Sequence, residues 1–413
     1  MPDVKDNGGL PMKEKENDSG RYVRIGTTLY KIVRKPLLSG DSIEVRVPWN
    51  YETLRQDHSK DFISQIEKFD GFCSVPDHIN YQRCIGTFLN QYEAIAYLPS
   101  RGNCPVTMEF LTYLFGEQLE MGLDYLQLLY LKPLIRLPIL LLVSTERNTG
   151  KTTFLNFLKA IFAGNMSFNT NEDFHSQFNS DWANKLIVGV DEALLDRRED
   201  SERIKNLSTA ISYKAEAKGK DRYEIDFFAK FVMSSNNEEC PIIIEQGETR
   251  YWVRKIQPIE KKNVGMLNDL KAEIPQFLHF LLKRKLSTKH GSRMWFRHDL
   301  LVTDALRKII MHNRGKVEIE MLHIISEIMQ IKKLKEYQFS IKDMLDMLKR
   351  LSIQTEASQL RKILQDNWKL EPHPPTYYTA YLFGYNDEIL SSPKTARLYR
   401  MTQKQVEEIM SEC

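Results

Sequence analysis

The residues best suited to chemistry begin with a glycine–lysine–threonine triplet, Gly150, Lys151 and Thr152. The apolar run 139–143 precedes this triplet, and apolar residues recur after it at helical spacing. A helix N-terminus leaves backbone N–H groups unpaired and carries a partial positive charge, so it binds phosphate well. In this context the lysine reaches the β- and γ-phosphates of a nucleotide, and the threonine hydroxyl binds Mg²⁺. The pattern therefore predicts a phosphate-binding loop.

The start of this loop departs from the pattern G-x-x-x-x-G-K-[ST], because Thr145 stands where the first glycine falls. The departure predicts a changed conformation at the start of the loop. The alternative is an ordinary helix start with a surface lysine, which needs no nucleotide. In the nucleotide interpretation, the residues that contact ATP are Thr149, Gly150, Lys151, Thr152 and Thr153.

A second apolar run, 186–190, ends in Asp191 and Glu192. Asp191 would hold Mg²⁺ through water, and Glu192 would orient or deprotonate an attacking water molecule. By itself, a strand that ends in two acids is more often a solvated strand end. The acids follow Lys151 by 191 − 151 = 40 residues, which leaves room for one helix and its connections. The two motifs together favour nucleotide hydrolysis.

The composition sets broad limits. At 413 residues, 42% hydrophobic and 27% charged, the chain is long enough for two or three domains. The net charge of +3 is small, so nucleic-acid contacts must come from local placement of lysine and arginine. The five cysteines form no C-x-x-C pair, which favours a reducing cytoplasm and argues against a zinc site. Neither a signal peptide nor a membrane helix is expected.

Changes in pattern divide the chain into segments. Residues 1–20 are polar and are expected to form a disordered tail. The pattern of residues 21–132 predicts a hairpin followed by helices, an α+β region that would form a supporting collar for the next domain. The strands and helices of 133–262 alternate, which predicts an α/β P-loop domain with a parallel, AAA+-like sheet. Residues 263–290 predict a helical segment. Residues 291–413 predict helices and then two strands, the pattern of a winged helix.

Shorter patterns predict one helix cap and the ranges of individual helices and strands. Ser340 and Asp343 have the spacing of a capping box. Helices are predicted at 51–70, 106–131, 265–285, 298–312, 316–334, 340–351 and 356–369. Strands are predicted at 377–385 and 397–401.

Several strings between about residues 133 and 285 resemble superfamily 3 helicases. More narrowly, they resemble the helicase part of phage and mobile-element primase-helicases and prim-pol-like polymerases. The first hundred residues show no catalytic primase pattern. The strings that carry the resemblance are VSTERNTGKTTFL, FNSDWANKLIVGVDEA, YEIDFFAKFVMSSNN, GETRYWVRKI and EIPQFLHFLL.

The resemblance implies roles for further residues. Asn236 would sense the γ-phosphate from a strand between the two nucleotide-binding strands. Arg250 would be an arginine finger that acts on ATP held by a neighbouring subunit, with Arg254 as the alternative. Lys218 and Lys220 fall on the hairpin that such helicases point into a ring channel, where they would follow the backbone of single-stranded DNA. The ordinary alternatives are a strand-end cap, an internal salt bridge and two solvated lysines.

The resemblance implies an ATP- and Mg²⁺-dependent DNA helicase that forms a hexameric ring and serves replication of a phage or mobile element. It would act in the cytoplasm of a bacterial or phage-infected cell, with a primase or polymerase on a separate chain. A second hypothesis is a protein that binds ATP without turnover and contacts duplex DNA through its C-terminal helices. A third, a P-loop phosphotransferase, lacks a visible small-substrate site.

Overall fold

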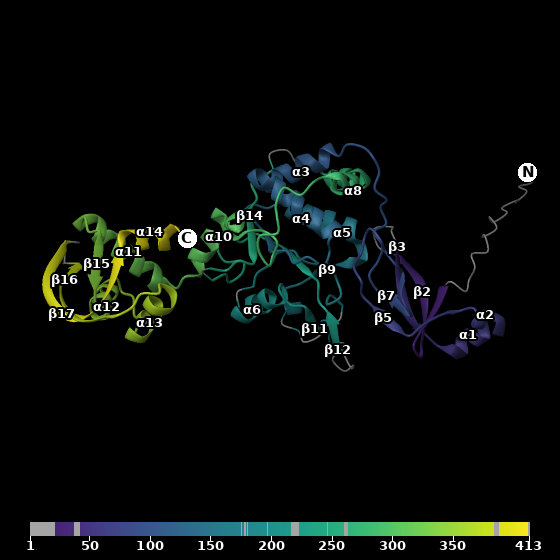
Figure 1. The fold of residues 1–413 in the computed structure, drawn as a ribbon, viewed down its shortest axis with the longest axis horizontal. Helices are drawn as coiled ribbons and strands as arrows, with labels where there is room; N and C mark the ends of the chain where they lie inside the picture. The colour runs from purple at the N-terminus through teal and green to yellow at the C-terminus, as the bar shows by residue number, and fades with distance from the viewer. Residues whose placement is uncertain are drawn as a thin grey trace, which may run out of the picture. The chain divides into compact units, whose positions relative to one another are not determined.

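The computed structural model describes residues 21–36, 42–174, 176, 179, 181–195, 197–215, 223–245, 247–259, 263–383 and 388–411. It divides the chain into two units, one ending at Ala94 and one beginning at Ile95 (Figure 1). The predicted tail 1–20 lies outside the described residues. In the part that is described, no helix has both the length and the apolar character needed to cross a membrane.

The first unit is built on a sheet of four strands in the order β3-β2-β1-β4. The predicted hairpin is present, as β2 pairs antiparallel with β3. The predicted helix 51–70 is instead two short helices and a strand, because Ser59 caps a new helix by accepting a hydrogen bond from the Phe62 N–H at 3.3 Å. The elements are β1 (Tyr22–Ile25), β2 (Thr28–Pro36), β3 (Ser42–Trp49), α1 (Tyr51–Asp57), α2 (Lys60–Ser64), β4 (Glu67–Phe69), β5 (Gly71–Cys73), β6 (Cys84–Ile85) and β7 (Phe88–Asn90).

The second unit contains a five-stranded parallel sheet in the order β14-β8-β13-β10-β9. This confirms the predicted α/β class with a parallel sheet. The strand β8 is fully buried, as its continuous apolar sequence requires in a sheet covered on both faces. The strands are β8 (Ile139–Val143), β9 (Met166–Asn169), β10 (Ile187–Val190), β13 (Lys230–Ser235) and β14 (Tyr251–Lys255).

Helices that flank this sheet come from distant parts of the sequence. The Glu273 carboxylate accepts hydrogen bonds from the backbone N–H groups of Val106 at 3.2 Å and Thr107 at 2.7 Å, at the start of α3. The structural division therefore falls before α3, whereas the sequence pattern places a boundary at residue 132. The helices are α3 (Pro105–Phe115), α4 (Leu119–Leu131), α5 (Lys151–Phe162), α6 (Arg198–Leu207), α7 (Met266–Ala272), α8 (Ile274–Lys283), α9 (His298–Leu301) and α10 (Asp304–Asn313).

Within this unit, one prediction changes in detail and one is confirmed. The helical segment 265–285 is two helices, because Pro275 sits in the first turn of α8 and starts it anew. The hairpin after α6 is formed by β11 (Ser212–Ala215) and β12 (Tyr223–Asp226), which pair antiparallel. Single 3₁₀ turns lie at Gly116–Gln118, Ala163–Asn165 and Glu172–Phe174.

Residues 316–411 form a module with its own core around Phe339, Met344, Met347 and Leu364. The predicted capping box is confirmed, because Ser340 and Asp343 exchange their side-chain and backbone hydrogen bonds at the start of α12. Its strands form an antiparallel sheet in the order β15-β17-β16. The elements are α11 (Lys316–Lys332), β15 (Glu336–Phe339), α12 (Ile341–Arg350), α13 (Ala357–Lys362), a π-helical turn (Ile363–Asn367), β16 (His373–Phe383), β17 (Ile389–Thr402) and α14 (Gln403–Ser411).

Candidate active site

The loop between β8 and α5 turns through left-handed backbone positions. Gly150 has φ +79°, and a Cβ atom there would lie 3.1 Å from the Phe110 ring. Asn148, with φ +58°, supplies a second such position, which asparagine tolerates better than most residues. The backbone therefore needs glycine directly before Lys151 both for its conformation and for the space beside Phe110. The helix α5 begins at Lys151, as the triplet predicts.

The Lys151 ammonium is buried in this loop and is held by neutral oxygens. Its side chain donates to the Thr149 hydroxyl at 3.0 Å and to the Glu146 carbonyl oxygen at 3.3 Å. Burial lowers the pKa of Lys151, and the nearby carboxylates of Asp191 and Glu238 act in the opposite direction. The residue is only 6% exposed. A buried cation with neutral hydrogen-bond acceptors gains strongly from an anionic ligand.

The end of β10 meets the start of α5 at one carboxylate oxygen. Asp191 Oδ1 accepts a hydrogen bond from the Thr152 hydroxyl at 3.2 Å. The Ser234 hydroxyl, from β13, donates to the same oxygen. The loop after β8 and the acid after β10 thus form one site, with β13 between them in the sheet.

Glu192 has a left-handed backbone with φ +57°, which is uncommon for a residue other than glycine. The neighbouring strand holds this conformation, because the Ala193 N–H donates to the Ser234 carbonyl oxygen at 2.6 Å. The Glu192 carboxylate accepts a hydrogen bond from the Asn236 amide at 3.4 Å. Asn236 directly follows β13, so the structure places it beside the acidic pair. A strained residue held in this way is typical of functional sites.

Glu238 is a feature of the site that the sequence analysis missed. Glu238 is 4% exposed, and its carboxylate accepts a hydrogen bond from the Thr145 backbone N–H at 3.0 Å. It also forms ion pairs with Lys255 at 2.9 Å and with Lys308 at 3.6 Å. Burial would raise the pKa of Glu238, but the hydrogen bonds from Lys255 and Thr145 outweigh this and lower it. Glu238 therefore anchors the loop at the position where the usual glycine is absent.

Arg250 and Lys151 lie at opposite ends of the parallel strands. Arg250 precedes β14, and its carbonyl oxygen accepts from the Ile139 N–H at 2.8 Å, at the beginning of β8. The five residues of β14 correspond to about 16 Å along the strand. The guanidinium donates to both oxygens of Glu248 at 2.8 Å, and its side chain is 19% exposed. The structure therefore does not bring Arg250 to the site of its own chain.

The alternative finger, Arg254, has partners that are not residues of the site. Arg254 donates to Glu117 at 2.7 Å and to Gln118 at 3.1 Å, and is buried. Lys218 and Lys220 lie outside the described residues.

The pair of oxygens at Thr152 and Asp191 fits a magnesium ion. Mg²⁺ binds oxygen at about 2.1 Å in an octahedron, so neighbouring ligands lie about 3 Å apart. The observed separation is 3.2 Å. Within the described ranges, no group of three or more histidines, cysteines or acids could form a metal cage. A cation at this point would draw its remaining ligands from water and phosphate, as Mg²⁺ usually does.

Known proteins share both the sequence and the fold of this region. Residues 142–251, which contain the loop, the acidic pair and Asn236, match a family of unknown function, DUF5906. The DNA primase-polymerase of Nitratiruptor phage NrS-1 is 34% identical over 122 residues. The aligned segment is 28% of this chain and 17% of the relative, so most of that protein has no counterpart in the alignment.

Solved structures extend the likeness across most of the chain. The apo structure of the NrS-1 C-terminal region has a TM-score of 0.60 at 16% identity, covering 86% of this chain and 91% of that one. The A form apo structure of the same region has a TM-score of 0.59 at 14% identity, covering 90% of this chain and 96% of that one.

The fold places this chain among mixed α/β proteins with a five-stranded parallel sheet. Within that class, it is a homologue of the primase-polymerase of phage NrS-1 and has the fold of that protein's C-terminal region. The resemblance to prim-pol-like phage proteins that the motifs predict is therefore confirmed.

Proposed function

We propose that the chain is an ATP-dependent DNA helicase that acts in the replication of a phage or mobile element. The observation that carries the proposal is the hydrogen bond at 3.2 Å between Thr152 and Asp191. It joins the end of the lysine-bearing loop to the acid of a second strand, as a shared magnesium–triphosphate site requires. The sequence and fold likeness to a phage primase-polymerase supports a role in replication.

Each residue has a distinct part in this proposal. Lys151 exchanges the neutral oxygens of Thr149 and Glu146 for phosphate oxygens, and charge-assisted bonds of this kind are about twice as strong. The N–H groups at the start of α5, over Lys151, Thr152 and Thr153, face the phosphates. Thr152 and Asp191 are the residues that would hold Mg²⁺, which would neutralise phosphate charge when bound.

Glu192 orients or deprotonates the attacking water in this proposal, and Asn236 positions the Glu192 carboxylate. The same amide would sense the γ-phosphate, a role supported by the position of Asn236 after the strand between β8 and β10. One contact therefore links the presence of the γ-phosphate to the orientation of the general base.

Arg250 can act only on ATP bound to another subunit, because it lies about one strand length from the site of its own chain. We propose a ring, hexameric as the family resemblance implies, in which Arg250 leaves Glu248 and reaches the neighbouring phosphate. Single-stranded DNA would pass through the ring and contact Lys218 and Lys220. A separate primase or polymerase would be the partner, in the cytoplasm of a bacterial or phage-infected cell. We propose a winged-helix fold for the C-terminal segment 291–413.

A second candidate function is ATP binding without turnover, in a DNA-binding assembly protein. One observation favours it. The Thr145 N–H, at the position of the usual first glycine, already donates to Glu238. A loop whose start is anchored in this way could hold a nucleotide without the geometry for hydrolysis. This alternative predicts tight ATP binding and negligible turnover.

The decisive experiment measures ATP hydrolysis with and without single-stranded DNA. The wild type should hydrolyse ATP faster with DNA, and Lys151→Ala should abolish this turnover because it removes the phosphate-binding cation. Lys283→Ala, which removes an exposed lysine from the end of α8, is the matched control and should behave as wild type. Equal hydrolysis by wild type and Lys151→Ala would contradict the proposal.

A mixing experiment tests the placement of Arg250. Lys151→Ala and Arg250→Ala proteins are expected to be inactive alone. A mixture should recover part of the turnover, because some interfaces then pair an intact Lys151 with an intact Arg250. If the mixture is no more active than its components, Arg250 does not act between subunits.

A further inference from the structure

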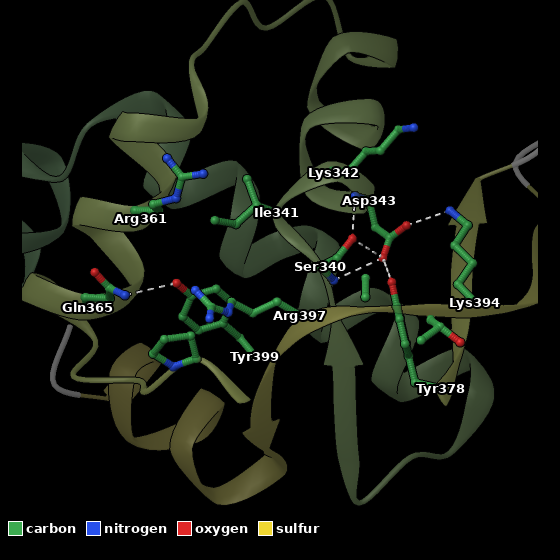
Figure 2. Close-up of a pocket in the computed structure, with 13 residues that line it drawn as sticks. Ser340, Ile341, Lys342, Asp343, Arg361, Gln365, Tyr378, Lys394, Arg397 and Tyr399 are labelled. Carbon is green, nitrogen blue, oxygen red and sulfur yellow. Dashed lines mark hydrogen bonds and ion pairs between the residues drawn. The ribbon is translucent and has the colours of Figure 1, made fainter. Parts of the chain in front are cut away.

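The module 316–411 contains an open cavity of about 520 Å³ between its helices and its sheet (Figure 2). The start of α12, the exposed face of α13 and the strand β17 line it. We call this cavity the basic pocket, after the cations on its wall: Lys342, Arg361, Lys394 and Arg397. They come from three elements that are separated in the sequence and converge on one space.

Among the residues that the structure describes, only one of these cations has a charged partner. Lys394 forms an ion pair with Asp343 at 2.6 Å. Lys342, Arg361 and Arg397 are exposed, and none of them forms an ion pair with any carboxylate in the described part of the chain. Three unpaired cations on a shared wall produce a local positive potential that the small net charge of the whole chain does not reveal.

The acid in the basic pocket is fully engaged and cannot neutralise this potential further. Asp343 is 1% exposed and accepts hydrogen bonds from Ser340, Tyr378 and Lys394, as Figure 2 shows. Burial would raise the pKa of Asp343, but the bonds from Lys394 and Tyr378 outweigh this and lower it. The pocket therefore has one internally paired cation and three that remain for an anion.

We propose that the basic pocket binds the phosphodiester backbone of duplex DNA through Lys342, Arg361 and Arg397. Exposed lysine and arginine side chains are the groups that contact backbone phosphates. An enclosed small-molecule site would instead bury its polar groups among apolar side chains. The site goes beyond the proposed ATP-dependent activity and needs no nucleotide.

The aromatic residues of the pocket favour duplex over single-stranded DNA. Proteins that bind single strands offer exposed aromatic rings on which bases stack. The two tyrosines in this wall, Tyr378 and Tyr399, are only 3% and 2% exposed. Their hydroxyls are also engaged, Tyr378 with Asp343 and Tyr399 with Gln365. The pocket thus presents charge without a stacking surface, which suits a duplex whose bases stay paired.

The experiment measures the affinity of the full-length chain for a labelled 30-base-pair duplex by fluorescence anisotropy over a series of salt concentrations. The pocket variant combines Lys342→Ala, Arg361→Ala and Arg397→Ala. Each phosphate contact contributes about 0.9 to the slope of log affinity against log salt, or about eightfold at 0.1 M salt. The pocket variant should therefore bind on the order of 10²-fold more weakly, with a slope smaller by about three.

A control variant removes the same charge elsewhere in the module, through Lys332→Ala, Lys335→Ala and Arg350→Ala, all exposed and outside the pocket. It should keep the wild-type slope. Equal losses in both variants would overturn the proposal, as would a loss confined to single-stranded DNA. So would a pocket variant that loses only binding of inorganic phosphate, measured by calorimetry.

ATP hydrolysis measured without DNA separates this proposal from the proposed function. The pocket variant should keep its basal turnover, because none of its three residues touches the β8–α5 loop site. Loss of duplex binding with unchanged turnover supports the basic pocket. Unchanged duplex binding overturns it, whatever the turnover shows about the helicase proposal.

Discussion

The active-site loop and the basic pocket use buried charge in opposite ways. Lys151 is buried and donates to neutral acceptors, so an anionic ligand would bind its charge favourably. Asp343 is buried and accepts hydrogen bonds from several donors, including the Lys394 ammonium, so its charge stabilises the module. A buried charge is therefore a candidate for chemistry where its direct hydrogen-bond partners are neutral, as at Lys151.

The largest effect on ATP hydrolysis is expected from Glu192→Gln. The amide keeps the contact with Asn236 but cannot accept a proton, so turnover should fall roughly 10³-fold while ATP binding is retained. Steady-state hydrolysis and nucleotide binding by fluorescence provide the two measurements. Glu199→Gln, on an exposed residue of α6 that is not part of the site, is the control and should turn over normally. A Glu192→Gln protein with wild-type kcat would remove Glu192 from the mechanism.

The next effect concerns stability rather than catalysis. Asp343→Asn replaces the charge that Ser340, Tyr378 and Lys394 share, and should destabilise α12 by about 3 kcal/mol. Hydrogen exchange of the α12 amides, followed by mass spectrometry, measures this locally. Asp346→Asn on the same helix, without a described ion pair, should leave the exchange rates nearly unchanged. Comparable protection in Asp343→Asn and wild type would show that the acid is not the anchor of the module.

Acid should weaken the same contacts in the wild type. The pKa of Asp343 is lower in the folded chain than its ordinary value, so its stabilising contribution is present above the ordinary pKa and is lost as pH falls through the folded one. Protection of α12 should therefore decline below about pH 4 in the wild type. It should decline less in Asp343→Asn, which has no proton to gain there. Parallel decline in the two proteins would assign the acid sensitivity to other groups.

The smallest effect is expected from Glu238→Gln. The amide oxygen can still accept from the Thr145 N–H, but the ion pairs with Lys255 and Lys308 are lost. A looser loop should raise the KM for ATP about tenfold, which corresponds to about 1.4 kcal/mol, with a smaller change in kcat. The neighbouring Glu239→Gln is the matched control, since Glu239 touches Lys308 but not the loop. Equal KM values in the two variants would argue that Thr145 needs no anchor.

The sequence predicted those features that depend on neighbours in the chain. The strand, turn and helix around Lys151 follow from local periodicity and glycine chemistry, and the Ser340–Asp343 cap follows from its spacing. The parallel sheet follows from alternation of strands and helices. The break at Ser59 was missed because a cap inside an apolar period is ambiguous.

Contacts between distant segments could not be predicted. Glu238 reaches Thr145 across 93 residues, and Glu273 reaches Thr107 across 166 residues. Neither pairing has a signal in spacing or composition, because each depends on how strands and helices pack. The basic pocket is of the same kind, since Lys342, Arg361 and Arg397 are unremarkable surface residues until the fold brings them together.

The central claim is that the ends of β8 and β10 form one magnesium–nucleotide site. The most direct test is the binding of a fluorescent ATP analogue to wild type, Lys151→Ala, Asp191→Asn and the double variant, each with and without Mg²⁺. Both single variants should bind weakly, Asp191→Asn should lose the benefit of Mg²⁺, and the double variant should be little worse than either. Wild-type, Mg²⁺-dependent binding by Asp191→Asn would contradict it.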